Sequence, residues 1–272
     1  MSKMSKVIFI TGASRGFGKI WAEAFLKRGD KVVVTARNID ALNDLVTNYK
    51  ENVLPIQLNV NNREACFEAV SQAKNHFGRI DVLINNAGYG LFGAIEETTE
   101  QQAREQMETN FFGLLWMSQA VLPAMRAQKS GHILQISSIL GLITLPVLGL
   151  YNASKFAVEG LSETLASEVA GFGIKVTMIE PNSFSTDWSG ASAVQTEQTA
   201  TYEPLKKVFR ENTDLANFGD PQTTTEAIIK VVDSINPPLR LLLGEFALPL
   251  VNQKYRQKLI LWNEWKEVSA NA

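Results

Sequence analysis

The sequence predicts an α/β fold, in which a doubly wound parallel sheet lies between two layers of helices. Three observations predict it. Short runs of apolar residues alternate with amphipathic stretches from the first residues onward. The runs are apolar throughout, as is typical of strands that helices cover on both faces. The 272 residues, 45% of them hydrophobic, suffice for one large core, so we expect a single domain over residues 1–272.

Each element is expected where its pattern begins and ends. Strands are expected at residues 7–10, 31–35, 53–60, 81–84, 133–136, 175–179 and 239–243. Helices are expected at residues 19–28, 40–50, 63–77, 101–128 and 152–170, with further helices after residue 220 and around Trp262. Gly29 and Gly78 directly follow two of these helices, and glycine at that position is a common helix stop.

Charge and composition exclude several classes of protein. The chain has 26 Lys plus Arg and 28 Asp plus Glu, a net charge of −2, which gives no electrostatic reason to expect nucleic acid or an anionic membrane as a partner. Cys66 is the only cysteine, so the chain can form neither a disulfide framework nor a cysteine-based zinc site. Because His76 and His132 are the only histidines, we expect no catalytic metal.

Residues 133–150 are apolar enough to imitate a membrane span. Gln135, Ser137 and Pro146 interrupt them and would be costly in lipid, so a buried strand followed by an apolar loop is expected instead. The basic N-terminus leads directly into a strand without a cleavage site. We therefore expect no signal peptide, no membrane span and a cytoplasmic location.

A glycine-rich segment follows the first strand and opens the first helix. Residues 11–18 read Thr-Gly-Ala-Ser-Arg-Gly-Phe-Gly, with Gly12, Gly16 and Gly18 as the small positions. Small residues let the backbone approach a pyrophosphate, and a helix N-terminus offers free N–H groups to it. The sequence therefore predicts a dinucleotide-binding fold, with the ligand at the carboxyl ends of the strands.

The end of the second strand bears on the choice of nicotinamide cofactor. An NAD site usually has an acidic residue there, which binds the ribose 2′-hydroxyl. Residues 34–38 read Val-Thr-Ala-Arg-Asn and hold no carboxylate. Arg37, together with Arg15 in the glycine segment, could bind a 2′-phosphate through its guanidinium, although both could also be solvated surface arginines. We expect NADP(H).

Three side chains suggest the chemistry. Tyr151 and Lys155 are four positions apart on an expected helix and so share one face, which lets the ammonium act on the phenol. Ser138 follows the expected strand at residues 133–136. A phenol beside a cation, a hydroxyl donor and a phosphate-binding loop suit hydride transfer between a nicotinamide and a carbonyl, with the tyrosine handling the proton. The sequence therefore predicts an oxidoreductase.

The chain resembles the short-chain dehydrogenase/reductase family, in its compact single-domain branch. The motifs that carry the resemblance occur in family order between residues 7 and 186: the glycine segment, Asn85-Asn86-Ala87-Gly88, Asn110, Ser137-Ser138, Tyr151-Asn152-Ala153-Ser154-Lys155 and Pro181 to Thr186. The resemblance implies a Rossmann-like fold of three layers, α/β/α.

The resemblance also implies roles. Tyr151 would be the acid/base, Ser138 would hold the substrate oxygen, and Lys155 would bind the nicotinamide ribose and lower the pKa of the tyrosine. Asn110 would interrupt its helix and hold a water that connects Lys155 to solvent. Cofactor contacts are implied for Gly12, Ser14, Arg15, Gly16, Phe17, Gly18, Arg37, Asn59, Val60, Asn86, Ala87, Gly88, Tyr151, Lys155, Pro181 and Thr186.

Two positions depart from the family pattern. Asn59 stands where Asp often meets the adenine amino group, and its amide oxygen can still accept that hydrogen bond. Asn182 stands where the family usually has Gly after Pro181. Asn tolerates positive φ better than most residues, so the turn is expected to persist.

The expected pocket wall is apolar, and it predicts a hydrophobic ketone or aldehyde and the corresponding alcohol. It would comprise Tyr89, Leu91, Phe92, residues 140–150, Phe184 and Trp188, with Ser138, Tyr151 and Phe184 as substrate contacts. Residues 184–220 are the least regular part of the chain and are expected to form a substrate lid.

The tail, residues 237–272, holds two aromatic side chains, Trp262 and Trp265. We expect them to pack on the body, although closing the pocket or forming an interface would give the same spacing. The family resemblance implies a homodimer or homotetramer, formed through the helices that carry Asn110 and Tyr151.

Three alternative functions stay open. The substrate could be a ketoacyl thioester on a carrier protein, which would require a basic docking patch beside the pocket. An epimerase or dehydratase that retains NAD would usually need a distinct substrate domain, for which this chain has little room. A non-catalytic NADP(H)-binding regulator would usually lack the tyrosine or the lysine, whereas Tyr151 and Lys155 are both present.

Overall fold

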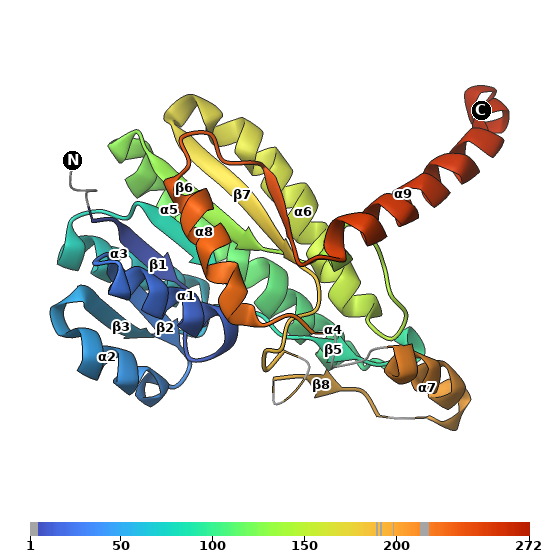
Figure 1. The fold of residues 1–272 in the computed structure, drawn as a ribbon, viewed down its shortest axis with the longest axis horizontal. Coiled ribbons are helices and arrows are strands. Elements are labelled where there is room, and N and C mark those ends of the chain that lie inside the picture. Colours follow the sequence, from blue (N-terminus) through green and yellow to red (C-terminus); the bar gives the residue numbers. More distant parts are fainter. Residues whose placement is uncertain (1–4, 189, 191, 198, 213–217) are drawn as a thin grey trace.

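The structure is a computed structural model, and it describes residues 5–188, 190, 192–197, 199–212 and 218–272. Seven parallel strands form one sheet in the order β3-β2-β1-β4-β6-β7-β9 (Figure 1). Their bounds are β1 Val7–Ile10, β2 Lys31–Ala36, β3 Val53–Gln57, β4 Val82–Asn85, β6 Gly131–Ile136, β7 Ile174–Pro181 and β9 Arg240–Leu243. The predicted doubly wound parallel sheet is confirmed.

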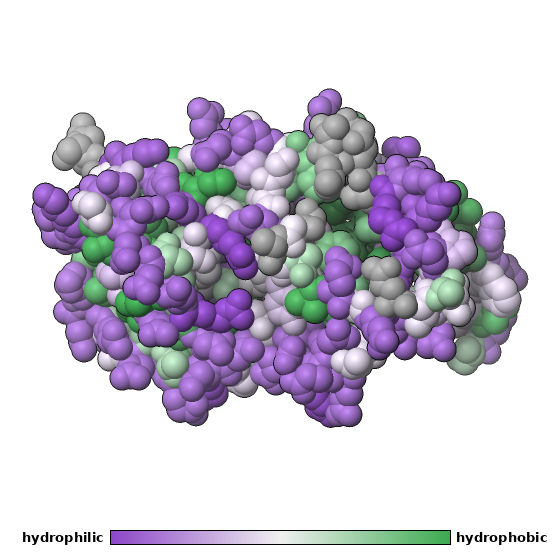
Figure 2. Space-filling view, turned by 90° about the horizontal axis from the view of Figure 1, so that it is seen from below, coloured by the Kyte–Doolittle hydropathy of each residue, from purple (hydrophilic) through white to green (hydrophobic). Residues whose placement is uncertain are grey.

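Helices cover both faces of this sheet, as the apolar strands predict. One face packs on α1 (Gly16–Lys27), α2 (Asn43–Tyr49) and α8 (Thr224–Asp233). The other face packs on α3 (Arg63–Phe77), α5 (Gly113–Gln128) and α6 (Gly149–Val169). Alternate residues of a strand point to opposite faces, so Ile8 and Ile10 join the first core and Phe9 the second. The outer surface in the view of Figure 2 is mainly hydrophilic.

The expected long helix at residues 101–128 is two helices. α4 (Glu100–Met107) and α5 are joined by a π-helical turn, Glu108–Phe112, with Asn110 in its centre. Such turns are often found at functional sites. The interruption that the family resemblance implies at Asn110 is therefore present.

The expected lid, residues 184–220, is more regular than its composition suggests. A short strand, β8 (Val194–Gln195), pairs in parallel with β5 (Leu91–Phe92), and α7 (Glu203–Asn212) follows it. Residues 189, 191, 198 and 213–217 of the segment lie outside the described part of the chain. This small second sheet fixes part of the segment to the loop after β4.

The tail forms α9 (Ala247–Glu264) and a short α10 (Lys266–Ala270). Ala247 and Val251 are buried, and Lys258 still donates to the carbonyl oxygen of Leu142 at 3.2 Å, but the helix then leaves the body and ends well away from it (Figure 1). Trp262 and Trp265 are each 60% exposed, so the expectation that they pack on the body of this chain is wrong. The physical reason is that α9 continues straight past the last part of the body beneath it.

Residues 133–150 form β6, a 3₁₀ turn (Ile139–Gly141) and an apolar loop, as predicted. In the described part of the chain, no helix is long and apolar enough to cross a membrane.

Candidate active site

A cavity of about 850 Å³ lies at the carboxyl ends of the strands. The chain runs outward from β1 to β3 and then returns to β4, so the strand order reverses beside β1, the position where such sheets bind ligands. The cavity is lined by most of the predicted site residues: Gly12, Ser14, Arg15, Gly16, Phe17, Arg37, Asn59, Val60, Asn86, Ala87, Gly88, Ser138, Tyr151, Lys155, Pro181, Phe184 and Thr186. Gly18 and Asn110 are predicted site residues that lie behind this lining.

The glycine segment forms the loop between β1 and α1. Gly12 has a φ of 67°, a region that favours glycine, and a Cβ at this position would lie 2.9 Å from the Cα of Ala87. A Cβ at Gly18 would meet the carbonyl oxygen of Gly12. Gly18 therefore lets α1 start close against the loop, whereas Gly12 and Gly16 face the cavity.

Asn86 braces this loop from the end of β4. Its Nδ2 donates to the carbonyl oxygens of Thr11 and Gly12, each at 3.0 Å. In return, the Oγ1 of Thr11 accepts from the backbone N–H groups of Asn86 and Ala87, each at 3.0 Å. The expected contact of Asn86 with adenosine and ribose stays a prediction; the structure shows that its amide group holds the glycine loop in shape.

The N-terminus of α1 points its first turn at the cavity. Arg15 is the N-cap, and its side chain makes no capping hydrogen bond. The first N–H groups of a helix have no partner within the helix, and they carry the positive end of its dipole. This end of the cavity therefore suits a phosphate group.

Two arginines flank the same end of the cavity. Arg15 and Arg37 are exposed, and among the described residues neither forms an ion pair. The Nε2 of Gln57 donates to the carbonyl oxygen of Arg37 at 2.9 Å, which fixes the backbone after β2. Asn59 lies beside them, and its Oδ1 accepts from the N–H of Asn61 at 3.2 Å. Its oxygen keeps a second lone pair for another donor.

Ser138, Tyr151 and Lys155 meet at the other end of the cavity, as predicted. Ser138 follows β6, and its hydroxyl donates to the carbonyl oxygen of Pro181 at 3.4 Å and lies close enough to Tyr151 to act on the phenol. Tyr151 lies in the first turn of α6, and the Nζ of Lys155 lies 5.6 Å from the centre of the Tyr151 ring. Lys155 also donates to the carbonyl oxygen of Ile136 at 2.7 Å.

The electrostatics of this group differ from the expectation. Burial raises the pKa of Tyr151 above its usual value, and the nearby hydroxyl of Ser138 opposes this only in part. Burial also lowers the pKa of Lys155 to about 8, although the carboxylate of Glu159 opposes the shift. The protein alone therefore does not lower the pKa of the tyrosine. The cost of removing a phenolate from water exceeds what the Ser138 hydroxyl returns.

Asn110 is buried beneath the loop that follows β4. Its Oδ1 accepts from the N–H of Tyr89 at 3.1 Å, and its Nδ2 donates to the carbonyl oxygen of Tyr89 at 3.0 Å and to the Oγ of Ser154 at 3.3 Å. The side chain thus ties the π-helical turn to the cavity wall and to α6. Its implied role as a water holder stays a prediction.

The wall beyond Tyr151 is apolar. The Trp188 ring centre lies 4.8 Å from that of Tyr151 and 5.2 Å from that of Phe92. Leu91, expected in the wall, is buried beneath it instead. Further apolar lining comes from Leu140, Leu145, Leu148, Phe209, Phe246 and Leu250.

Three of these residues were missed as wall residues. Phe209 comes from α7, Phe246 immediately precedes α9, and Leu250 lies in the first turn of α9. Sequence reasoning left open whether the tail closes the pocket, and its start does line the cavity.

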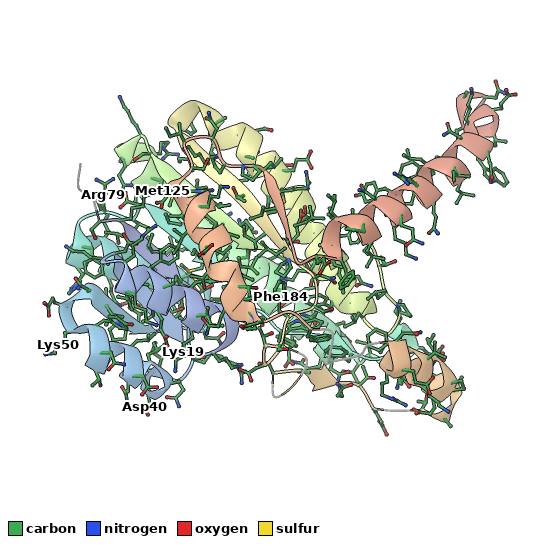
Figure 3. The ribbon with its side chains drawn as sticks, viewed as in Figure 1. Lys19, Asp40, Lys50, Arg79, Met125 and Phe184 are labelled. Atoms are coloured by element: carbon green, nitrogen blue, oxygen red, sulfur yellow. The ribbon has the colours of Figure 1, made fainter. Side chains whose placement is uncertain are left out.

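Phe184 lies nearer the cofactor end than expected. Its ring packs edge to face on Phe17, with the ring centres 5.4 Å apart, and it belongs to the core under α1 and α8. Figure 3 labels it on that side of the sheet, near the start of α8. Trp188, rather than Phe184, is therefore the aromatic residue of the expected lid that lies against Tyr151.

A buried ion pair holds α7 in place. The Nζ of Lys206 lies 2.6 Å from the Oε2 of Glu97, and both side chains are buried. Glu97 also accepts from the N–H and the hydroxyl of Thr199, each at 2.8 Å. The Lys206 ammonium holds the pKa of Glu97 down to about 2. This carboxylate therefore anchors the expected lid to the loop after β5 throughout the ordinary pH range.

Among the described residues, no group of three or more His, Cys, Asp or Glu side chains is placed to hold a metal ion.

The strand order, the phosphate loop and the Ser138–Tyr151–Lys155 group define the class: a dinucleotide-binding oxidoreductase. A family model of the short chain dehydrogenases matches residues 6–197, and the chain belongs to the short-chain dehydrogenase/reductase family. It is 40% identical over 270 residues to "Oxidoreductase BOA17" of Botryotinia fuckeliana, with 98% of each chain covered. It is 41% identical over 249 residues to a 3-ketodihydrosphingosine reductase of Bacteroides thetaiotaomicron, with 88% of each covered.

Solved structures show the same fold. A short-chain dehydrogenase from Streptomyces avermitilis is similar with a TM-score of 0.92 and 38% identity, over 100% of this chain and 99% of that one. ElxO with NADP bound is similar with a TM-score of 0.76 and 28% identity, over 90% of this chain and 100% of that one. A Burkholderia phymatum member in complex with NAD has a TM-score of 0.81 and 25% identity, over 94% and 95%. Members of the family thus bind either nucleotide.

Proposed function

We propose that this protein is an NADP(H)-dependent oxidoreductase that interconverts a hydrophobic ketone or aldehyde and the corresponding alcohol. One observation carries the proposal: the hydroxyl groups of Ser138 and Tyr151 meet beside Lys155, in a cavity that also holds the phosphate loop. The nicotinamide supplies or accepts the hydride. In reduction, Tyr151 donates its proton to the carbonyl oxygen, and Ser138 stabilises the developing alkoxide.

The pKa shift of Tyr151 bears on direction. Because burial raises this pKa, the phenol keeps its proton at neutral pH and is ready to act as an acid. Alcohol oxidation needs the phenolate, which forms only as the pH rises toward the pKa. At neutral pH the phenol is therefore in the protonated form that reduction needs, and the positive charge of an oxidised nicotinamide would favour the phenolate that oxidation needs.

Two observations support NADP(H) over NAD(H). Arg15 and Arg37 flank the cavity with their guanidinium groups outside any ion pair to a described residue. β2 ends at Ala36 without a carboxylate that could hold a ribose 2′-hydroxyl. A guanidinium matches a phosphate through two parallel hydrogen bonds. The NADP bound to ElxO is consistent with this preference.

The apolar wall supports a hydrophobic substrate. Phe92, Leu148 and Trp188 surround the tyrosine, and few charged side chains lie at this end of the cavity. Two relatives are named for apolar substrates: the 3-ketodihydrosphingosine reductase, and bovine retinol dehydrogenase 8, 33% identical over 270 residues, 93% of this chain and 86% of that one. We propose a substrate of that general kind.

The first test is NADPH oxidation against a panel of hydrophobic ketones and aldehydes, with NADH in parallel. We expect kcat/KM to favour NADPH by at least about tenfold, which corresponds to about 1.4 kcal/mol. Arg37→Gln should lower kcat/KM with NADPH by roughly 10- to 100-fold, because a charge-assisted hydrogen bond contributes about 1.5–3 kcal/mol, and should leave NADH nearly unchanged.

Arg126→Gln is the control, because Arg126 is an exposed arginine outside the cavity. Equal losses with both cofactors would remove Arg37 from 2′-phosphate recognition. Tight NADPH binding without turnover on any carbonyl would favour the regulator, or a carrier-bound ketoacyl thioester.

We also propose that residues 184–220 act as a substrate lid, because Trp188 and Phe209 line the apolar end of the cavity. Lys206→Met removes the cation that holds Glu97, so α7 should detach. We expect KM for bulky ketones to rise severalfold, KM for small ones to change little, and amide exchange in α7 to accelerate. Lys207→Met is the matched control, since this neighbouring lysine is exposed. The same response from both variants would argue against the lid.

The oligomeric state is proposed to be a homodimer or homotetramer. Leu259, Ile260, Leu261 and Trp262 fill one exposed turn of α9 and make it apolar on every side. Helices of that kind are normally enclosed by protein, whereas a helix on a membrane surface keeps one polar face. A second copy of this chain would enclose it, and a monomeric mass by sedimentation would contradict the proposal.

A further inference from the structure

Two buried glutamates lie behind the active site. Glu159 stands one turn after Lys155 on α6, and Glu180 is the next-to-last residue of β7, directly before Pro181. Glu159 is 5% exposed and Glu180 is fully buried. Buried carboxylates are costly unless they are paired, so the arrangement requires an explanation.

One arginine faces both of these glutamates. Arg240, the first residue of β9, donates through Nε to the Oε2 of Glu159 at 3.0 Å and through Nη2 to the Oε2 of Glu163 at 2.6 Å. Its Nε also lies 3.5 Å from the Oε1 of Glu180, within ion-pair distance. A single guanidinium therefore faces three carboxyl groups. Glu159 and Glu163 come from successive turns of α6, and Glu180 comes from β7.

The two buried carboxyl groups approach the same nitrogen, the Nε of Arg240, at 3.0 Å for Glu159 and 3.5 Å for Glu180, so they are close neighbours. Three of their oxygens accept no hydrogen bond from any described residue: both oxygens of Glu180 and the Oε1 of Glu159. Two carboxylates in contact repel, but a proton on one of them turns that oxygen into a donor for the other. Burial and the neighbouring Glu159 raise the pKa of Glu180 well above its usual range, so Glu180 is the member that holds the proton.

One shared proton also balances the local charge. The charged groups that face the pair are Lys155 and Glu163 on α6 and Arg240 on β9. With Glu180 protonated, two carboxylates (Glu159 and Glu163) oppose two cations (Arg240 and Lys155). With Glu180 ionised as well, the region would hold an unbalanced buried negative charge.

Glu159 is held close to Lys155. A Cβ at Gly141 would lie 2.8 Å from the Cγ of Glu159 and 3.0 Å from the carbonyl oxygen of Lys155. The Glu159 side chain is therefore enclosed between the 3₁₀ turn after β6 and its own helix, and it cannot turn away from the lysine. Lys155 itself is buried, so this nearby negative charge acts on it with little screening.

We propose that Glu159 and Glu180 share one proton behind the active site, and that the negative charge remaining on Glu159 keeps Lys155 in its ammonium form. Both are positioning residues. The value of the ammonium for the reaction rests on the function proposed above, whereas the proton sharing and the state of Lys155 are properties of the protein alone.

Direct titration of Lys155 tests the proposal without substrate or nucleotide. The ¹⁵N shift of Lys155 Nζ, followed by NMR in protein with labelled lysine, reports its pKa. Glu159→Gln removes the negative charge, and we expect the Lys155 pKa to fall by about one to two units, as for a charge lost at close range in a partly dry site. Glu159→Asp keeps the charge and should restore most of the shift.

Two controls separate charge from structure. Glu180→Gln places a neutral donor where the protonated carboxyl stood, so the titration of Lys155 should stay as in the wild type. Glu163→Gln removes the same charge from an exposed position on the same helix and should change it little. Thermal melts of all variants check that they fold.

Infrared spectroscopy gives the second readout. A carbonyl band of a protonated carboxylic acid should be present at pH 7 in the wild type and absent from Glu180→Gln. If that band is missing from the wild type, or if Glu159→Gln and Glu180→Gln move the Lys155 pKa alike, the proposal is overturned.

The pH dependence of NADPH-driven reduction then connects the pair to function. The ammonium of Lys155 is lost as the pH rises through the pKa of the lysine. In Glu159→Gln, where that pKa is lower, the fall of the reduction rate at high pH should therefore move to lower pH by about the same one to two units. The limb should not move in Glu163→Gln. If no carbonyl is turned over, the proposed function fails while the NMR and infrared results still decide this inference.

Discussion

Tyr151→Phe should lower kcat for carbonyl reduction by about 10³-fold, within the range of about 10²- to 10⁴-fold that a positioned general acid contributes. The substitution removes the hydroxyl that meets Ser138 and would donate the proton. It keeps the ring that packs against Trp188 and lies beneath Lys155. NADPH affinity should therefore change little. Single-turnover NADPH oxidation measures the first quantity and calorimetry the second.

Tyr89→Phe is the matched control for that experiment. Tyr89 is a second phenol in the lining of the same cavity, where burial raises its pKa to about 12, but it follows β4, and Ser138 acts on Tyr151 and not on Tyr89. Its loss should leave kcat within severalfold of the wild type. Comparable losses from the two variants would mean that neither phenol is the specific proton donor. A tyrosine-to-phenylalanine variant of ElxO has been solved with NADPH bound, so such a change is compatible with nucleotide binding in that relative.

The sequence predicted the sheet well because its signal is local. β1, β2 and β6 are mostly apolar runs, and a run of this kind by itself predicts a strand that is buried on both faces. The glycine loop was equally readable, since it sits between a strand and a helix. The sequence did not show why position 12 must be a glycine. The structure shows that Ala87, 75 positions later in the chain, leaves no room for a Cβ there.

Properties that depend on burial could not be predicted. The spacing of Tyr151 and Lys155 places a cation near a phenol, and this alone suggests a lowered tyrosine pKa. The structure adds the removal of both groups from water, which acts in the opposite direction on the phenol and raises its pKa. Glu159 and Glu180 were missed for a related reason. Each stands in an otherwise ordinary helix or strand, and only the fold brings them together.

The end of α9 shows a different limit. Its apolar residues predicted a packed helix, and the pattern of one helix says how much apolar surface needs cover but not which neighbour provides it. In this chain the body stops short of Trp262 and Trp265, which remain exposed. Exposed surface of this kind indicates an interaction site rather than a core.

Gly12→Ala should destabilise the fold by about 2–5 kcal/mol. The left-handed φ of 67° costs an alanine about 1–2 kcal/mol. The new methyl group would lie 2.9 Å from the Cα of Ala87, and overpacking of this kind typically costs about 1–3 kcal/mol more. Urea unfolding measures the total. The melting temperature should fall by about 2–4 °C per kcal/mol.

Gly78→Ala separates the two contributions. Gly78 has a φ of 80°, similar to that of Gly12, but a Cβ there meets nothing within 4 Å. It should therefore show the backbone cost alone, and the difference between the variants measures the contact with Ala87. Equal destabilisation would mean that the segment after β4 yields freely to the methyl group. Because Ala87 and Gly12 both line the cavity whereas Gly78 ends α3, only Gly12→Ala should also weaken NADPH binding.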